Sequence, residues 1–277
     1  MIGRFEPLQG TVEREHGLLE APRWRPDGSL IYSDVTAGGI FELRAGEAPR
    51  ALLPGRRGVG GLLPHVDGGV VASGRSVFHF DGETQRELLA PDGVPGFNDL
   101  STDGEGRIYA GALRFRPMAG ERPVPGEIWR IEGRGRGEPI ARGVEWPNGI
   151  GHSADGATLY VSDTSRRVVM AFPAEGGGPG EVFAEPGEGV PDGLAVDAEG
   201  GVWVALGAAG IARYRPDGRL DQMLEVPASF TSSLSFGGGD GRRLFVTTAD
   251  LDGDQRGGVV LSSRSEIPGL PLALAAV

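Results

Sequence analysis

Six short apolar runs follow glycine turns at nearly even intervals along this chain. The turn glycines lie 38 to 50 residues apart, and valine, leucine or isoleucine begins each run two or three residues later. Glycine turns between apolar runs are typical of β-hairpins. A repeat of this length is typical of β-propeller blades of four strands each. The six turn glycines are Gly28, Gly68, Gly106, Gly156, Gly200 and Gly241.

The strands expected around these hairpins account for most of the chain. Third strands are expected at 39–43, 76–80, 127–131, 168–172, 211–214 and 259–262, and fourth strands at 50–53, 86–89, 139–141, 182–184 and 222–226. The sixth repeat has no clear fourth strand, because the chain after Ser265 is rich in proline. Segment 8–15 (LQGTVERE) is an expected strand without a repeat of its own, after a frayed lead-in at 1–7.

The extra strand at the N-terminus can supply the fourth strand that the sixth repeat lacks. If segment 8–15 fills the last blade, the ring closes and no sheet edge is left exposed. We therefore predict an all-β fold, a six-bladed β-propeller with four-stranded blades whose last blade contains the N-terminal strand. The repeat runs nearly from end to end, so a single domain over residues 1–277 is expected.

The residues eight positions before the turn glycines are expected to form a ring at one mouth of the central channel. Register-equivalent residues of propeller blades lie at the same height, and four of the six have a carboxylate or amide oxygen. Turn preference is the competing explanation, because Asn and Asp favour turns. The chain has only two asparagines, however, and both fall at this register. The six positions are Glu20, Gly60, Asn98, Asn148, Asp192 and Ser233.

Composition limits the classes of partner. The chain has no cysteine, which excludes disulfides and thiolate metal sites. A net charge of −11 argues against a nucleic-acid surface. No apolar run approaches the roughly 18 residues of a membrane span, and residues 1–6 lack the apolar run of a signal peptide. We expect a cytoplasmic protein with a small-molecule substrate and without nucleic-acid or membrane partners; the sequence does not indicate an oligomeric state.

The oxygen donors of the ring predict a site for one divalent metal ion. Hard oxygen ligands suit Ca²⁺, Mg²⁺ or Mn²⁺, whereas Zn²⁺ is less favoured because cysteine is absent and histidine is scarce. Such an ion could polarise a carbonyl and acidify bound water, while Asp192 or Glu20 takes a proton. This chemistry fits hydrolysis of an ester-like or phosphoester-like bond. The alternative is a structural ion that ties the blades together.

Histidines and other aspartates offer further candidates near this mouth. His152 shares an expected strand with Asn148 and either approaches the site or packs in the core. His16 precedes Glu20, and Asp34 ends a second strand. Asp163 also ends a second strand, where it either supports the site or caps the following turn.

Two long connections are expected at the same mouth. Segments 113–126 and 249–257 join the second and third strands of blades three and six. Long loops at such a position are either lids and specificity elements or plain surface insertions. No Gly-x-Ser-x-Gly element occurs, so serine-hydrolase chemistry has no support from the sequence.

Four motifs in order resemble the regucalcin (senescence marker protein)/gluconolactonase/luciferin-regenerating enzyme family. The resemblance spans nearly the whole chain, and the Pro-Asp-Gly-x-x-x-Asp-x-x-Gly run is its most specific part. The motifs are Glu20-Ala21-Pro22-Arg23-Trp24, Phe97-Asn98-Asp99, Pro147-Asn148-Gly149-Ile150 and the run from Pro191 to Gly200.

The resemblance implies a six-bladed propeller with one divalent metal ion in its channel. We expect calcium as the ion, with magnesium, manganese or zinc as alternatives. By motif match the metal ligands are Glu20, Asn148 and Asp192, and Asp192 is also the general base. Asn98 then holds water or substrate at longer range. Known members include sugar lactonases, so the implied function is metal-dependent hydrolysis of a lactone or ester.

Two departures from the family pattern bear on the substrate. The family's Glu-Gly-Pro is Glu20-Ala21-Pro22 here, and the arginine that sugar lactonases often carry two residues before Asn98 is Gly96. Arg114 is our candidate for a replacement substrate contact, with Arg116 and Arg75 as alternatives, while Phe115 and Met118 favour a more apolar substrate.

Two other functions stay open on the sequence alone. One is a non-catalytic propeller that binds a ligand or partner and holds a structural ion, since fold does not fix function. The other is a family member recruited to a different metal-assisted reaction in a biosynthetic pathway.

Overall fold

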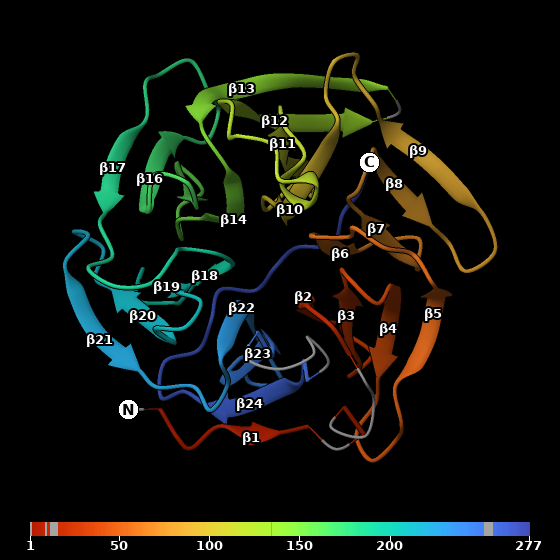
Figure 1. Cartoon of the computed structure of the whole chain (residues 1–277), viewed down its shortest axis with the longest axis vertical. Coiled ribbons are helices and arrows are strands. Elements are labelled where there is room, and N and C mark those ends of the chain that lie inside the picture. Colours follow the sequence, from red (N-terminus) through yellow and green to blue (C-terminus); the bar gives the residue numbers. More distant parts are fainter. Residues whose placement is uncertain (1, 9, 12–15, 134, 252–256) are drawn as a thin grey trace.

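Six antiparallel sheets of four strands each stand in a ring around a central axis (Figure 1). The computed structural model describes residues 2–8, 10–11, 16–133, 135–251 and 257–277. The predicted six-bladed β-propeller is confirmed. The one helix among these residues is the short 3₁₀ helix η1 (Pro117–Ala119), and none has the length and hydropathy needed to span a membrane.

The first three blades follow the chain, each running from the innermost strand to the outermost. Blade one contains β2 (Leu19–Trp24), β3 (Leu30–Asp34), β4 (Gly39–Leu43) and β5 (Arg50–Pro54). Blade two contains β6 (Leu62–Pro64), β7 (Val70–Ala72), β8 (Val77–Phe80) and β9 (Gln85–Leu89). Blade three contains β10 (Gly96–Thr102), β11 (Ile108–Leu113), β12 (Gly126–Gly133) and β13 (Arg136–Val144).

The last three blades repeat this order. Blade four contains β14 (Pro147–His152), β15 (Thr158–Asp163), β16 (Val168–Pro173) and β17 (Glu181–Ala184). Blade five contains β18 (Leu194–Val196), β19 (Val202–Ala205), β20 (Ile211–Tyr214) and β21 (Leu220–Leu224). Blade six contains β22 (Phe230–Gly237), β23 (Arg243–Ala249), β24 (Val260–Arg264) and β1 (Glu6–Pro7).

The hydrophobic core is divided among the six interfaces between neighbouring blades. Each interface holds its own cluster of buried side chains, including the one between blades six and one. A blade is therefore covered on both faces, so its strands read as continuous apolar runs rather than alternating ones. Leu30, Ile31 and Tyr32 illustrate this, since all three are buried although they are consecutive in β3.

The N-terminal chain closes the last blade, but through different residues from those expected. Strand β1 pairs with β24 at Glu6 and Pro7, within the segment that we expected to be a frayed lead-in. From the expected strand, Leu8 donates its amide to Val260 O at 2.8 Å and the Thr11 hydroxyl accepts from Val260 N at 3.4 Å, while residues 9 and 12–15 lie outside the described part. Pro7 has no amide hydrogen to donate, which an edge strand tolerates.

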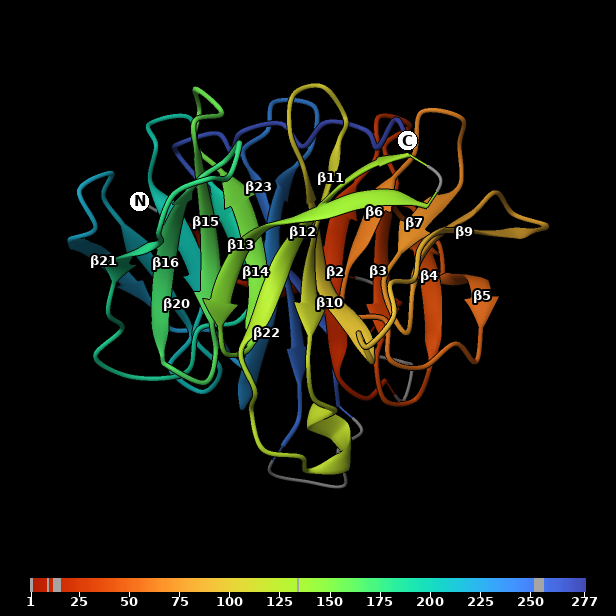
Figure 2. The same cartoon turned by 90° about the horizontal axis from the view of Figure 1, so that it is seen from above.

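The chain after β24 crosses the ring at the end where the hairpin turns lie (Figure 1). Leu270 N donates to Val196 O at 2.9 Å, Thr102 Oγ1 donates to Ala273 O at 2.6 Å and Ala275 N donates to Pro64 O at 2.8 Å. These bonds tie the segment to blades five, three and two. The opposite end, at which the inner strands begin, is here called the site mouth. Figure 2 shows η1 projecting from the site mouth, with the C-terminus at the other end.

Candidate metal centre and active site

Four of the ring positions lie at irregularities of the inner strands. The pairing register shifts after Glu20 in β2, across Asn98 in β10, across Asn148 in β14 and just before Ser233 in β22. A β-bulge bends its strand and re-aims the side chain, and bulges are common beside active sites. Asp192 precedes β18 and is held by the bond from its amide to Ala205 O at 2.9 Å.

Hydrogen bonds connect most neighbouring inner strands around the site mouth. The first four bonds given next join segments that contain ring positions, and the fifth joins β3 of blade one to Val59, which precedes Gly60. The bonds are Asn98 Nδ2 to Pro147 O (3.1 Å), Gly149 N to Asp192 O (3.1 Å), Gly193 N to Ser232 O (2.8 Å), Ser232 Oγ to Leu19 O (2.6 Å) and Ser33 Oγ to Val59 O (2.7 Å). Gly60 completes the ring without a side chain, and a Cβ there would collide with Asn98 Oδ1.

Asn148 is held between two neighbours of the site. Its amide nitrogen donates to Thr164 Oγ1 at 3.2 Å, and the Thr164 hydroxyl donates to Pro191 O at 2.8 Å. A hydrogen bond between Asn148 and the Asp192 carboxyl acts to lower the pKa of Asp192. With its nitrogen used in this way, the carbonyl oxygen of Asn148 is the atom that suits a metal ion. Thr164, which follows directly after Asp163, has no signal of its own in the sequence.

The carboxyls of Glu20 and Asp192 are both buried and close enough to influence each other. Each residue is 8 % exposed. Burial, followed by the charges of Asp192 and Asp99, raises the pKa of Glu20 well above its usual range. Burial, followed by the charge of Asp99, does the same to the pKa of Asp192. Carboxyls with such raised pKa values are characteristic of functional sites.

A buried ion pair next to the ring was missed by the sequence analysis. Arg23 Nη2 donates to Asp99 Oδ1 at 2.9 Å and to Leu100 O at 3.0 Å, although blade two lies between β2 and β10. Gly61 makes this reach possible, because a side chain there would collide with Leu100. Burial raises the pKa of Asp99 even though the Arg23 cation opposes the shift. Arg23 and Asp99 belong to the motifs that resemble the family, and no other feature of the sequence indicates that they pair.

The charges and unpaired oxygens of this site fit a divalent cation. Three buried carboxyls, those of Glu20, Asp99 and Asp192, share one cationic partner, Arg23, so the ionised site carries a net charge of about −2. Asp192 Oδ1 and Asp99 Oδ2 are buried without a hydrogen-bond partner among the described residues, and an unpaired buried carboxylate oxygen is costly unless an ion or water satisfies it. Among the residues that the structure describes, no three His, Asp or Glu side chains converge as a metal cluster. A cation would therefore need amide oxygen as well as carboxylate.

The other sequence candidates have mostly structural partners. His16 contacts Asp34 Oδ2 at 3.2 Å and the Tyr32 hydroxyl at 3.1 Å. Asp163 accepts from the amides of Glu145, Trp146 and Arg166 at 2.9 to 3.2 Å, which is the turn-capping alternative. Asp34 likewise accepts from the amides of Gly17, Thr36 and Ala37.

His152 lies away from Asn148, the expected metal ligand in the same strand. It borders a cavity of about 820 Å³ that is also lined by hairpin turns and the C-terminal segment, at the end opposite the site mouth. Its ring packs edge-on against Tyr109 at 4.5 Å, and neither ring nitrogen has a hydrogen-bond partner among the described residues. Burial lowers the pKa of His152 to about 4, so the ring is neutral at pH 7.

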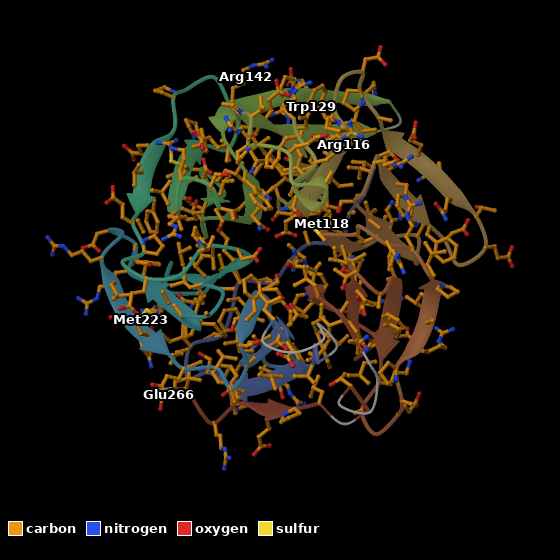
Figure 3. The ribbon with its side chains drawn as sticks, viewed as in Figure 1. Arg116, Met118, Trp129, Arg142, Met223 and Glu266 are labelled. Atoms are coloured by element: carbon orange, nitrogen blue, oxygen red, sulfur yellow. The ribbon has the colours of Figure 1, made fainter. Side chains whose placement is uncertain are left out.

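The long connection of blade three reaches the site mouth. Figure 3 places Met118, which is 74 % exposed, near the centre of the ring. Phe115 is buried edge-on against Trp146 at 5.4 Å. Arg114 donates to Gly93 O at 2.8 Å and to Glu127 Oε2 at 2.6 Å, so part of its guanidinium is held by the protein itself. Most of the second expected loop, 249–257, lies outside the described residues.

Ala21 adopts a backbone conformation that favours glycine, with φ +49°. We expect Ala21→Gly to change the free energy of unfolding by less than about 1 kcal/mol, because relief of strain offsets the lost buried methyl group and the added chain entropy. We expect Ala21→Val to destabilise by about 2 kcal/mol or more, since a branched side chain tolerates neither this φ nor the buried position. Urea unfolding of both variants measures the two changes in free energy of unfolding. Equal changes for Ala21→Gly and Ala21→Val would contradict backbone strain at Ala21.

Comparison with known proteins connects this geometry to one family. The family model described as the SMP-30/gluconolactonase/LRE-like region matches residues 18–250. Pentonolactonase XacC of Haloferax volcanii is 32 % identical, over 90 % of this chain and 87 % of its own. The 6-deoxy-6-sulfogluconolactonase of Pseudomonas putida is also 32 % identical, over 95 % of this chain and 97 % of its own.

Solved structures match the fold along almost the whole chain. A luciferin-regenerating enzyme superposes with a TM-score of 0.87 at 18 % identity, covering 99 % of this chain and 100 % of its own. A calcium-binding regucalcin of Agrobacterium tumefaciens gives a TM-score of 0.85 at 24 % identity, covering 99 % and 98 %. At these identities the likeness concerns the fold alone.

Proposed function

Because this chain belongs to the SMP-30/gluconolactonase/LRE-like family, we propose that it is a divalent-metal-dependent hydrolase that opens a small-molecule lactone. The observation that carries the proposal is the buried Asp192 carboxyl. One of its oxygens has no hydrogen-bond partner among the described residues, and it lies beside Asn148 and within the electrostatic reach of Glu20. Relatives named as a pentonolactonase and a sulfogluconolactonase support a sugar-derived lactone as the substrate.

The residues proposed to hold the ion are Glu20, Asn148 and Asp192. Two carboxylates and one amide oxygen form a hard donor set, for which calcium is our first choice and magnesium, manganese and zinc the alternatives. When bound, such an ion supplies Lewis-acid polarisation of a carbonyl and lowers the pKa of water. Arg23 stays paired with Asp99 and limits the excess negative charge around the ligands.

Asp192 is the proposed general base. Its free Oδ1 can accept a proton from the water that attacks the lactone carbonyl. The ring C–O bond then breaks, and the proton returns to the departing alkoxide, so that water is added across the bond. Asn98, whose nitrogen is held by Pro147 O, presents its carbonyl oxygen to orient the water or substrate. Arg114 stays our predicted substrate contact on the blade-three loop.

Proton release from a panel of lactones tests the proposal. Metal-stripped protein is assayed with sugar-derived and aliphatic lactones after addition of Ca²⁺, Mg²⁺, Mn²⁺ or Zn²⁺. We expect turnover that depends on the added ion and is highest with a sugar-derived lactone. If an ion binds and no lactone is cleaved, the site belongs to a non-catalytic propeller or to a different metal-assisted reaction.

The metal ion is expected to stabilise the protein more at high pH than at low pH. Unfolded carboxyls ionise at about pH 4, whereas folded Glu20 and Asp192 retain protons to higher pH. The metal-free protein therefore loses unfolding free energy as the pH rises from about 4 through these raised pKa values. An ion that binds the ionised pair reverses this loss.

Thermal unfolding with and without chelator measures this linkage. At pH 8 and a free ion concentration of 100 times Kd, we expect a rise in Tm of about 5 to 10 °C. At pH 5 the rise should be smaller, because protons compete with the ion for both carboxyls. A rise of equal size at both pH values would show that Glu20 and Asp192 do not bind the ion.

A further inference from the structure

Arg56 lies at the rim of the site mouth, in the segment that joins β5 to β6. A Cβ atom on Gly74 would lie 3.4 Å from Arg56 Nη2. The carbonyl of Gly74 accepts the amide of Phe97 at 2.7 Å. Because Phe97 directly precedes Asn98, these contacts place the Arg56 guanidinium on the Asn98 side of the mouth.

The Arg56 guanidinium has no acidic partner within the part of the chain that the structure describes. Its central carbon lies 4.9 Å from the centre of the Phe78 ring, and its Nε is buried without a hydrogen-bond partner among the described residues. The buried arginines Arg23 and Arg213, by contrast, each pair with a buried aspartate. A stacked, partly desolvated guanidinium keeps its two terminal nitrogens in a planar fork that matches an oxyanion.

Two glycines, Gly74 and Gly96, lie between this guanidinium and the start of β10. Apart from chain neighbours, the only atoms within 4 Å of a Cβ on Gly74 would be Arg56 Nη2 and Gly58 O. A Cβ on Gly96 would meet only carbonyl atoms of Gly74. A side chain at Gly74 would therefore press against Arg56 Nη2, and glycine at both positions keeps side-chain atoms away from this flank of the guanidinium.

We propose that Arg56 binds an oxyanion substituent of the substrate, so that the preferred lactone carries a negative charge at the end distant from its reacting carbonyl. This inference rests on the proposed lactonase function and narrows its substrate class. A cationic subsite also offsets the repulsion that an anionic substrate meets from a protein of net charge −11. The shared chemistry is a carboxylate, sulfonate or phosphate oxygen that accepts from the guanidinium.

Matched lactones test the assignment. The metal-loaded protein is assayed with a hexonolactone and with the same lactone bearing a carboxylate, sulfonate or phosphate at carbon 6. Arg56→Gln removes the charge, Arg56→Lys keeps the charge without the planar fork, and Arg57→Gln is the matched control. Arg57 is the exposed neighbour on the same segment.

We expect Arg56→Gln to raise KM for the anionic lactone roughly 10- to 100-fold more than KM for the neutral one, as the loss of a charge-assisted hydrogen bond implies. Arg56→Lys should recover part of this loss, and Arg57→Gln should change neither KM. Equal changes for both lactones in Arg56→Gln, or no change, would overturn the proposal. The three substituents then show which oxyanion is preferred.

A binding measurement separates this proposal from the lactonase assignment. Calorimetry compares a sugar dicarboxylate with the corresponding monocarboxylate on metal-loaded wild type and Arg56→Gln. If wild type cleaves no lactone, the proposed function fails. The subsite is still supported if the dicarboxylate binds more tightly and Arg56→Gln removes that advantage. It is refuted if wild type binds both alike.

Discussion

Asp192→Asn is expected to lower lactone turnover by about 10³-fold or more, because it removes both the proposed base and a charged metal ligand. The amide keeps the shape of the carboxylate, so the fold should survive. Metal affinity should fall with turnover, since one of the two charged ligands of the proposed site is lost. Initial rates at saturating metal and calorimetric titration of the ion measure the two effects.

Stability separates this role from a purely structural one. Because burial and Asp99 raise the pKa of Asp192, removing its charge should leave the metal-free protein at least as stable as wild type at pH 8. Asp217→Asn makes the same chemical change in the exposed β20–β21 turn and should alter neither turnover nor metal affinity. Full turnover in Asp192→Asn would refute its assignment as base and ligand.

Arg23→Met is expected to lower the free energy of unfolding by about 3 to 5 kcal/mol. The substitution removes the cation paired with Asp99, and removing one partner of a buried pair leaves the other charge uncompensated. Arg23 is 5 % exposed and Asp99 2 %, so water cannot replace the lost contact. Urea unfolding of the metal-free protein at pH 8 measures the change.

An exposed pair serves as the control for this prediction. Arg44 and Asp27 lie 2.7 Å apart with side chains 40 % and 42 % exposed. Arg44 also contacts Glu42 at 3.3 Å, but Glu42 keeps its bonds to Arg25 and Arg50. Arg44→Met should therefore cost less than about 1 kcal/mol. The double variant Arg23→Met/Asp99→Asn should recover part of the loss, because no unpaired charge remains. If Arg23→Met and Arg44→Met cost the same, the pair at the site does not carry the stability assigned to it.

The ring of oxygen donors was predictable because it depends on local spacing. Glu20, Asn98, Asn148 and Asp192 each stand eight residues before a turn glycine, and an inner strand of roughly constant length carries that register to the mouth. The bulges at the first three were not predictable, because a shift in pairing depends on the neighbouring strand. Ala21 is an example, because the local sequence Glu-Ala-Pro does not predict a positive φ.

Closure of the last blade was predictable in principle but not in detail. The missing fourth strand of blade six required a partner, and only the N-terminal chain was left to supply it. The residues that pair, Glu6 and Pro7, are polar or lack an amide hydrogen and give no strand signal. Their pairing is decided by where β24 presents its free edge.

The sequence by itself determined the all-β class, the six blades and the register of the site, because these follow from periodic signals within each repeat. Only the tertiary structure decided that Arg23 meets Asp99, 76 residues away across blade two. It also placed Arg56 against Phe78 and Gly74. Such pairings join different blades, so no spacing along the chain encodes them, and they exist only once burial of the six interfaces has closed the ring.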